Sequence, residues 1–216
     1  MEDRIQAIYQ ELCCTLEDMN VEQRYYLALM GMNRTLCVCS RLAKCDFFQD
    51  IDKLTEFMEK NSRDIFEHKQ VYNGYSEMKE LFEEYSVQWE DFLSADWHEG
   101  QDAVLTGCLD AFMSEWYGFL GVICASYKYN TPERIAGNMT LPIRCLDGYL
   151  RDYIFYHKGR IEDDQLQDFI NKHTAIEKEA ERISSDIQAV LNSDLETIYK
   201  RLYSYSKLDI FEGLET

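Results

Sequence analysis

Two carboxylates that could do chemistry interrupt the most apolar stretch of the chain. Asp110 and Glu115 lie within residues 103–127, AVLTGCLDAFMSEWYGFLGVICASY. A carboxylate buried in such a stretch needs a partner, because an unpaired charge is costly in an apolar interior. The candidate partners are three arginines: Arg24, Arg34 and Arg144. Two interpretations stay open, a structural ion pair or the functional group of a helical enzyme or small-ligand-binding protein.

Motifs for catalysis or cofactor binding do not occur elsewhere in the sequence. There is no phosphate-binding glycine loop, no nucleophile elbow and no HExxH motif. No histidine follows a glutamate by three residues, as the paired metal sites of helical bundles require. The sequence contains four histidines: His68, His98, His157 and His173. The acidic run 162–164 resembles a magnesium-binding motif, but it opens a helix, where acidic residues interact favourably with the dipole. We therefore expect no metal, no cofactor and no enzymatic activity.

The eight cysteines show no metal-binding pattern either. No CxxC pair is present, and Cys37 and Cys39, two residues apart on a helix, would point about 200° away from each other. The amino terminus, MEDRIQAIYQELCC, lacks the basic start and continuous apolar run of a signal peptide. We expect reduced thiols in the core of a cytoplasmic protein.

Residues 103–127 are predicted to form a buried central helix. Small residues recur on one side of it at steps of three and four, which lets a neighbouring helix approach closely. They are Gly107, Ala111, Ser114, Gly118, Gly121 and Ala125. The opposite side carries bulky apolar residues that would fill the core. The charges of Asp110 and Glu115 argue against insertion into a membrane.

The rest of the chain also follows helical periodicity, and only two prolines occur. We expect helices over residues 3–16, 46–60, 75–89 and 143–157, and one helix or two over 162–191. A further helix should begin at an Asn20 cap, with Gln23 in the capping-box position, and end at Cys45. The last helix should begin at an Asp194 cap and end at about Leu208. Gly159 should end the helix 143–157, and 137–142 should be irregular. The predicted fold is all-α: one domain, residues 1–216, forming an antiparallel bundle of about eight or nine helices around the central helix 103–127.

The charge balance limits the partners that the protein could bind. Lys and Arg number 22, Asp and Glu number 40, and the formal net charge is −18. This excess opposes binding to nucleic acid or to an anionic membrane surface. It favours a basic protein partner, whose encounter would be steered by charge.

Residues 75–102 are the best candidate for such a partner-binding surface. Acidic side chains surround aromatic ones there, and interfaces combine aromatic anchors with complementary charge. The candidate binding residues are Glu77, Glu80, Glu84, Glu90, Asp91, Asp96, Trp97 and Glu99. For each of these residues a simple solvated helix face is the alternative.

Three segments resemble a family of small uncharacterised all-α bacterial proteins. They are residues 21–36, VEQRYYLALMGMNRTL, residues 102–126, and residues 171–191, with Ile176-Glu177-x-Glu179 and Ile187-Gln188-x-x-Leu191. Residues 102–126 depart from the family in carrying bulky aromatics where it is richer in alanine. The family includes presumed immunity proteins that neutralise polymorphic toxins. The resemblance implies an immunity-type protein that binds a cognate toxin, or another basic protein, directly. A homodimer that buries the surplus aromatic residues is a further possibility.

Overall fold

The computed structural model describes residues 4–38, the single residues 56, 60, 63 and 67, and residues 130–192 and 194–214. Six helices cover most of these ranges: α1 (Arg4–Glu17), α2 (Val21–Arg34), α7 (Pro132–Lys158), α8 (Asp163–Asn171), α9 (Thr174–Asn192) and α10 (Leu195–Tyr205). The described ranges contain no strand, which confirms an all-α fold for this part of the chain. The predicted central helix 103–127 lies outside the described residues.

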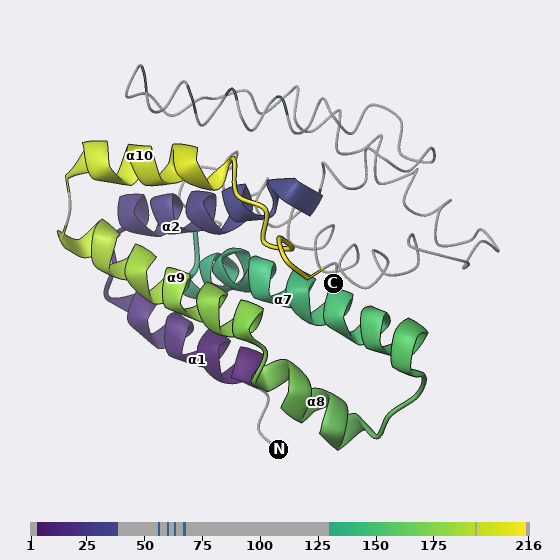
Figure 1. Ribbon diagram of the computed structural model, residues 1–216. Coiled ribbons are helices and arrows are strands. Elements are labelled where there is room, and N and C mark those ends of the chain that lie inside the picture. The colour runs from purple at the N-terminus through teal and green to yellow at the C-terminus, as the bar shows by residue number, and fades with distance from the viewer. Residues whose placement is uncertain are drawn as a thin grey trace, which may run out of the picture.

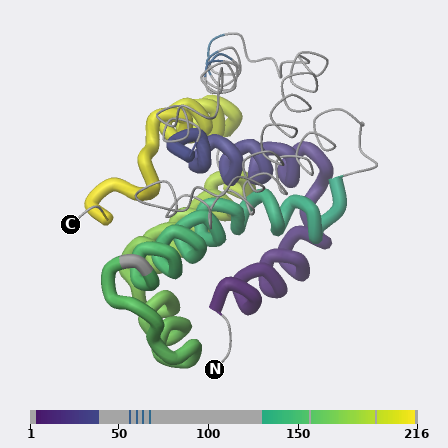
Figure 2. Tube along the Cα trace, turned by 90° about the vertical axis from the view of Figure 1, so that its right-hand side faces the viewer, coloured from purple at the N-terminus to yellow at the C-terminus, as the bar shows by residue number. Residues whose placement is uncertain are grey.

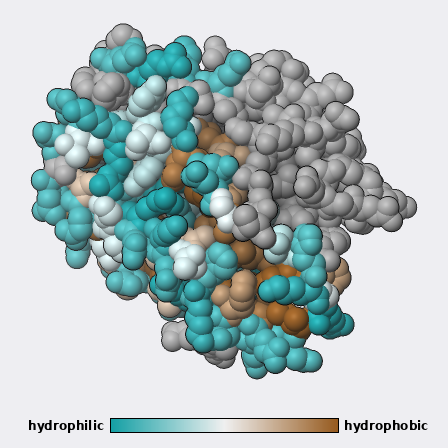
Figure 3. All heavy atoms as spheres, viewed as in Figure 1, coloured by the Kyte–Doolittle hydropathy of each residue, from teal (hydrophilic) through white to brown (hydrophobic). Residues whose placement is uncertain are grey.

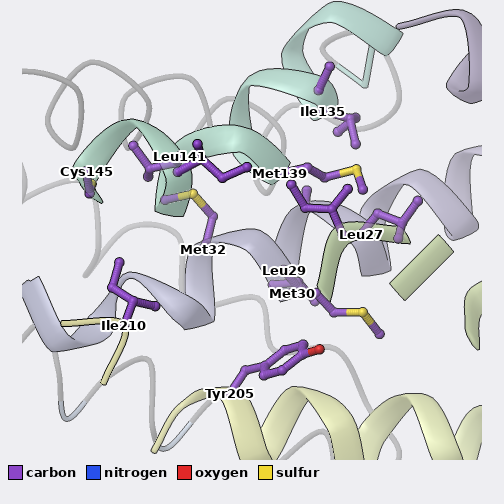
Figure 4. Close-up of a cluster of buried hydrophobic side chains, with 14 of the residues drawn as sticks. Leu27, Leu29, Met30, Met32, Ile135, Met139, Leu141, Cys145, Tyr205 and Ile210 are labelled. Carbon is purple, nitrogen blue, oxygen red and sulfur yellow. The ribbon is translucent and has the colours of Figure 1, made fainter. Parts of the chain in front are cut away.

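Helix α2 lies between α7 and α10 and shares the core with both (Figures 1 and 4). Helix α7 is the longest of the six described helices, and it packs against α1, α2, α8 and α9 (Figure 2). In Figure 4, Met32 lies below Leu141 and Cys145 of α7, and Met30 lies above Tyr205 of α10. Residues 26–34 of α2 are therefore buried on both faces. Among the described residues, no helix is long and apolar enough to cross a membrane.

The local capping signals in the sequence predict several helix ends correctly. Asn20 Oδ1 accepts a hydrogen bond from Gln23 N at 2.9 Å, and Asn20 N donates to Gln23 Oε1 at 3.0 Å, which completes the capping box. Asp194 Oδ1 accepts from Thr197 N at 2.8 Å and caps α10. Gly159 ends α7 with φ of 75°, a conformation that glycine adopts without strain.

Other boundaries differ from the predictions. Helix α2 ends at Arg34 with Thr35 as its C-cap, and residues 36–38 are helical again. The predicted end at Cys45 lies outside the described residues. The stretch 162–191 does agree with its prediction, because it forms two helices, one of the two alternatives, and Asp163 and Asp164 occupy the first turn of α8. Helix α10 ends at Tyr205 instead of Leu208, because a turn follows directly.

The prediction of an irregular stretch at 137–142 is wrong, because α7 continues through Pro142. Proline has no N–H, so the carbonyl of Asn138, four residues earlier, lacks its usual helical donor. The hydroxyl of Thr140 supplies an extra donor to this turn, with Oγ1 2.8 Å from the oxygen of Ala136. The turn is fully buried, and packing against α2 offsets the unfavourable proline.

Gly31 of α2 lies directly against this part of α7. A Cβ atom added at Gly31 would come within 2.2 Å of the carbonyl oxygen of Asn138. The carbonyl that Pro142 leaves without a helical donor thus faces the one residue of α2 that has no side chain. This close approach brings the two backbones together at the centre of the described core.

His173 fills the gap between α8 and α9 and acts as the N-cap of α9. Its Nδ1 accepts a hydrogen bond from the backbone N–H of Ala175 at 3.3 Å, and its ring lies 5.5 Å from that of Phe169. A protonated imidazole could not accept this bond, and its charge would oppose the helix dipole. Burial lowers the pKa of His173 below its ordinary value.

The close approach predicts the effect of Gly31→Ala. In an open helix this change would stabilise the protein by about 1 kcal/mol. Here the two helices must separate, so we expect the free energy of unfolding to fall by about 1–3 kcal/mol. Urea denaturation followed by circular dichroism measures this change. The control is Gln10→Ala on the exposed side of α1, which should stay within about 0.5 kcal/mol of the parent. A gain in stability for Gly31→Ala would contradict the close packing.

The His173 cap predicts a loss of stability in mild acid. Because the folded pKa is depressed, the unfolded chain binds this proton at higher pH. Stability should therefore decline as the pH falls from about 7 through the folded pKa of His173. His173→Asn keeps a capping side chain that does not titrate, so this variant should hold its stability at pH 7 and show a weaker pH dependence. Thermal unfolding between pH 7 and pH 5 compares the two proteins, and identical slopes would refute the role of His173.

Candidate functional site

The most unusual charged group in the described residues is Arg34, at the end of α2. Its side chain has an exposed fraction of 0% and is one of the largest fully buried side chains. Moving a guanidinium out of water costs several kcal/mol unless opposite charges surround it. The neighbours of Arg34 must therefore supply negative charge.

Two carboxylates of α9 meet this requirement. Arg34 Nη1 pairs with Asp186 Oδ2, and Arg34 Nε lies 3.0 Å from Glu179 Oε2. Neither of these two atoms forms a hydrogen bond, so the second contact is an ion pair. The guanidinium carbon also lies 4.9 Å from the ring centroid of Tyr205 on α10, in cation–π geometry. Three helices thus meet around one positive charge.

Further groups complete the coordination of the two acids. Asp186 Oδ1 accepts from Tyr205 Oη at 2.7 Å and from Arg201 Nη1 at 2.9 Å. Glu179 Oε1 pairs with Arg182 Nη1. We call this set the Arg34 cluster: Arg34, Glu179, Arg182, Asp186, Arg201 and Tyr205. Three guanidiniums face two carboxylates, and Arg182 and Arg201 reach partly into solvent.

The sequence of α9 explains why the acids meet Arg34. The buried stripe of α9 follows steps of three and four residues, which places it along one face of the helix. In order, it reads Ile176, Glu179, Ile183, Asp186 and Val190. Two acids thus occupy positions in a stripe whose other members are apolar. On α10, Arg201 and Tyr205 are four residues apart and share a face in the same way.

The environment of the cluster keeps both Arg34 and Tyr205 protonated. Burial by itself lowers the pKa of Arg34, but the carboxylates of Asp186 and Glu179 outweigh this effect and raise the pKa above its ordinary value. Burial, and then the charge of Asp186, raise the pKa of Tyr205. The guanidinium stays charged and the phenol stays protonated. Three of the four carboxylate oxygens accept hydrogen bonds, and the fourth, Glu179 Oε2, lies in the ion pair with Arg34, so every oxygen of the two acids faces a guanidinium or the phenol.

The three arginines proposed as partners of the buried carboxylates have different roles. Arg34 joins the cluster on α9. Arg24 caps the end of α1, with Nε 2.8 Å from the carbonyl oxygen of Leu16, and also donates to the carbonyl oxygen of Asn130 at 3.2 Å. Arg144 donates from Nη2 to the carbonyl oxygen of Gly137 at 3.3 Å. Asp110 and Glu115 themselves lie outside the described residues.

The predicted partner-binding residues also lie outside the described residues, so the structure does not place them. They are Glu77, Glu80, Glu84, Glu90, Asp91, Asp96, Trp97 and Glu99. The Arg34 cluster, in contrast, was not predicted from the sequence. The signal that could have found it is the pair of acids at Glu179 and Asp186 in an otherwise apolar stripe.

Thiols and metal ligands add no second site in this part of the chain. Cys13, Cys14, Cys37 and Cys145 are not in disulfides, and of these Cys37 and Cys145 are buried. Within the described ranges, no group of three or more His, Cys, Asp and Glu side chains is arranged to hold a metal ion.

Comparison with known protein families, with curated proteins and with solved structures finds no match in any of the three. The similarity of residues 21–36, 102–126 and 171–191 to a bacterial family therefore stays an expectation from the sequence.

The Arg34 cluster predicts that Arg34→Met strongly lowers the stability of the protein. This change leaves two buried carboxylates without their main partner, and we expect the free energy of unfolding to fall by about 3–5 kcal/mol. Adding Glu179→Gln and Asp186→Asn removes the uncompensated charge, so the triple variant should be more stable than Arg34→Met alone. Lys178→Met, at an exposed position of α9, is the control and should change stability by less than about 0.5 kcal/mol. Urea denaturation measures all three. A triple variant that is less stable than the single one would contradict this account.

Proposed function

We propose that this protein is an acidic binding protein of the immunity type, which neutralises a basic toxin by direct protein–protein binding. The observation that carries the proposal is the distribution of charge along the chain. Residues 39–129 hold 18 acidic and eight basic side chains, a net charge of −10 out of −18. A surface with this excess attracts a basic partner and accelerates its encounter.

The Arg34 cluster supports binding over catalysis. Its carboxylates are engaged by guanidiniums and by the phenol of Tyr205, so they neutralise charge inside the fold. They are not available to take a proton from a substrate or to meet a partner. The acidic groups that remain for recognition are those elsewhere in the chain, and the densest run is 75–102.

We also propose a single domain of about eight or nine helices with 103–127 as its buried central helix. The small-residue stripe of that segment would allow the kind of close backbone approach that Gly31 makes with Asn138. In this arrangement 75–102 precedes the central helix and presents its acids to solvent.

Affinity capture from the native host over a series of salt concentrations tests the proposed function. We expect one basic protein in stoichiometric amount, which is lost as salt rises because screening weakens charge attraction. Its toxicity on expression should disappear when this protein is co-expressed. Absence of a stoichiometric partner, or capture of one that the protein does not neutralise, would contradict the proposal.

Charge reversal tests the location of the binding surface. The double variant Glu80→Lys and Glu84→Lys should slow association with the captured partner at least about tenfold, with a smaller change in dissociation. The matched control reverses Glu11 and Glu181, two exposed acids on α1 and α9, and changes the net charge by the same amount. Stopped-flow or biosensor kinetics measures both variants. Equal slowing by the two would show that total charge, and not residues 75–102, governs the encounter.

A further inference from the structure

A small pocket lies at the junction where α7 ends and α8 begins. Gly159, with φ of 75°, turns the chain there, and residues 160–162 connect the two helices. The volume of the pocket is about 230 Å³. At about 30 Å³ for each water molecule, this space holds about eight waters, which is less than a drug-sized ligand needs. We call it the α7–α8 pocket, and its occupant must be a small molecule.

Aliphatic side chains form part of the lining of this pocket. They are Ile154 near the end of α7, Ile161 in the connection and Leu166 on α8. Ile154 is buried, and Leu166 packs against the hydrophobic core, so two of the three are held in place. Figure 3 shows apolar residues gathered on the surface over these two helices. An aliphatic group bound here would leave water and contact the edge of the core, which favours its binding.

Arg151 also lines the pocket, and neighbouring side chains fix its guanidinium. Its Nε donates to both carboxylate oxygens of Asp147 at 3.0 Å, and its Nη2 donates to Gln167 Oε1 at 2.5 Å. Among the described residues, Nη1 has no hydrogen-bond partner. The guanidinium is therefore oriented in advance and keeps one nitrogen available for a ligand. A carboxylate is an anion that matches this donor.

Two further residues of the lining carry charges of opposite sign. Arg160 and Asp163 both line the pocket, and both side chains are exposed. Neither side chain has an ion-pair or hydrogen-bond partner in the part of the chain that the structure describes, so the two do not neutralise each other. A ligand with a single charge would attract one of them and repel the other. A zwitterion supplies an anion for Arg160 and a cation for Asp163.

We propose that the α7–α8 pocket binds a free α-amino acid with an aliphatic side chain. The carboxylate of the amino acid pairs with Arg151 and Arg160, and its ammonium pairs with Asp163. Its side chain lies on the aliphatic lining of Ile154 and Leu166, and this contact adds affinity that glycine does not gain. The proposal does not depend on the function proposed above, because none of these residues belongs to 75–102.

Isothermal titration calorimetry with L-leucine tests this proposal. We expect one site with a Kd of about 1 mM or tighter. Three related molecules each lack one part of leucine: 4-methylpentanoate has no ammonium, 3-methylbutylamine has no carboxylate, and glycine has no aliphatic side chain. Each should bind at least about tenfold more weakly, because one set of contacts is lost. No binding of L-leucine at about 10 mM would overturn the proposal, and so would equal binding of any of the three.

Two derivatives of leucine distinguish a free amino acid from the end of a peptide. N-acetyl-L-leucine keeps the carboxylate but loses the ammonium, as at a peptide carboxyl terminus, and L-leucinamide keeps the ammonium but loses the carboxylate. Both should bind more weakly than L-leucine. A derivative that binds as tightly as L-leucine would overturn the recognition of a zwitterion.

Two neutral variants test the charged residues of the lining. Asp163→Asn should weaken the binding of L-leucine at least about tenfold and leave that of 4-methylpentanoate unchanged or tighter, because it removes only the partner of the ammonium. Arg160→Gln should weaken both ligands. The matched control is Asp164→Asn, since Asp164 also lies in the first turn of α8 but does not line the pocket. Circular dichroism checks that the variants keep their helices. Equal binding of L-leucine by Asp163→Asn and Asp164→Asn would contradict the proposed role of Asp163.

Discussion

The buried charge of Arg34 is the constraint on which the described core depends. A guanidinium that is fully removed from water is tolerated only where opposite charge is close, and two acids of α9 provide it. This requirement fixes α9 relative to the end of α2. It also fixes α10, because Asp186 is held by Tyr205 and Arg201. An apolar contact could slide by a turn at modest cost, whereas this network has one arrangement that satisfies its charges.

Helix α2 carries a second constraint one turn before Arg34. Gly31 has no side chain to separate it from the backbone of α7, and it meets the carbonyl of Asn138. Asn33 extends the contacts of α2 to the other side, where its Nδ2 donates to the carbonyl oxygen of Leu202 on α10 at 3.1 Å. Within four residues, α2 is therefore fixed to α7, α9 and α10. The end of α2 organises the part of the fold that the structure describes.

The charges inside and outside the protein follow different rules. In the Arg34 cluster each carboxylate has positive partners, because the interior does not tolerate an unbalanced charge. On the surface water screens charge, so an excess of acid can persist and remain available for recognition. The proposed contact with the toxin would use such a strongly acidic surface. That contact does not need the residues of the Arg34 cluster, whose role is internal.

The sequence by itself determined the helical class of the described segments and those helix ends that a local cap defines. The capping box of Asn20, the aspartate cap of α10 and the glycine at the end of α7 all act within three or four residues, so neighbours in the sequence suffice to recognise them. Tertiary structure alone decided that α7 continues through Pro142 and that Arg34 pairs with Asp186, 152 residues away. The sequence contains several acids that could form an ion pair with Arg34, and local patterns could not show which of them does. That choice depends on which helix packs against α2, and the free energy of burying one charge beside another exists only once the helices have come together.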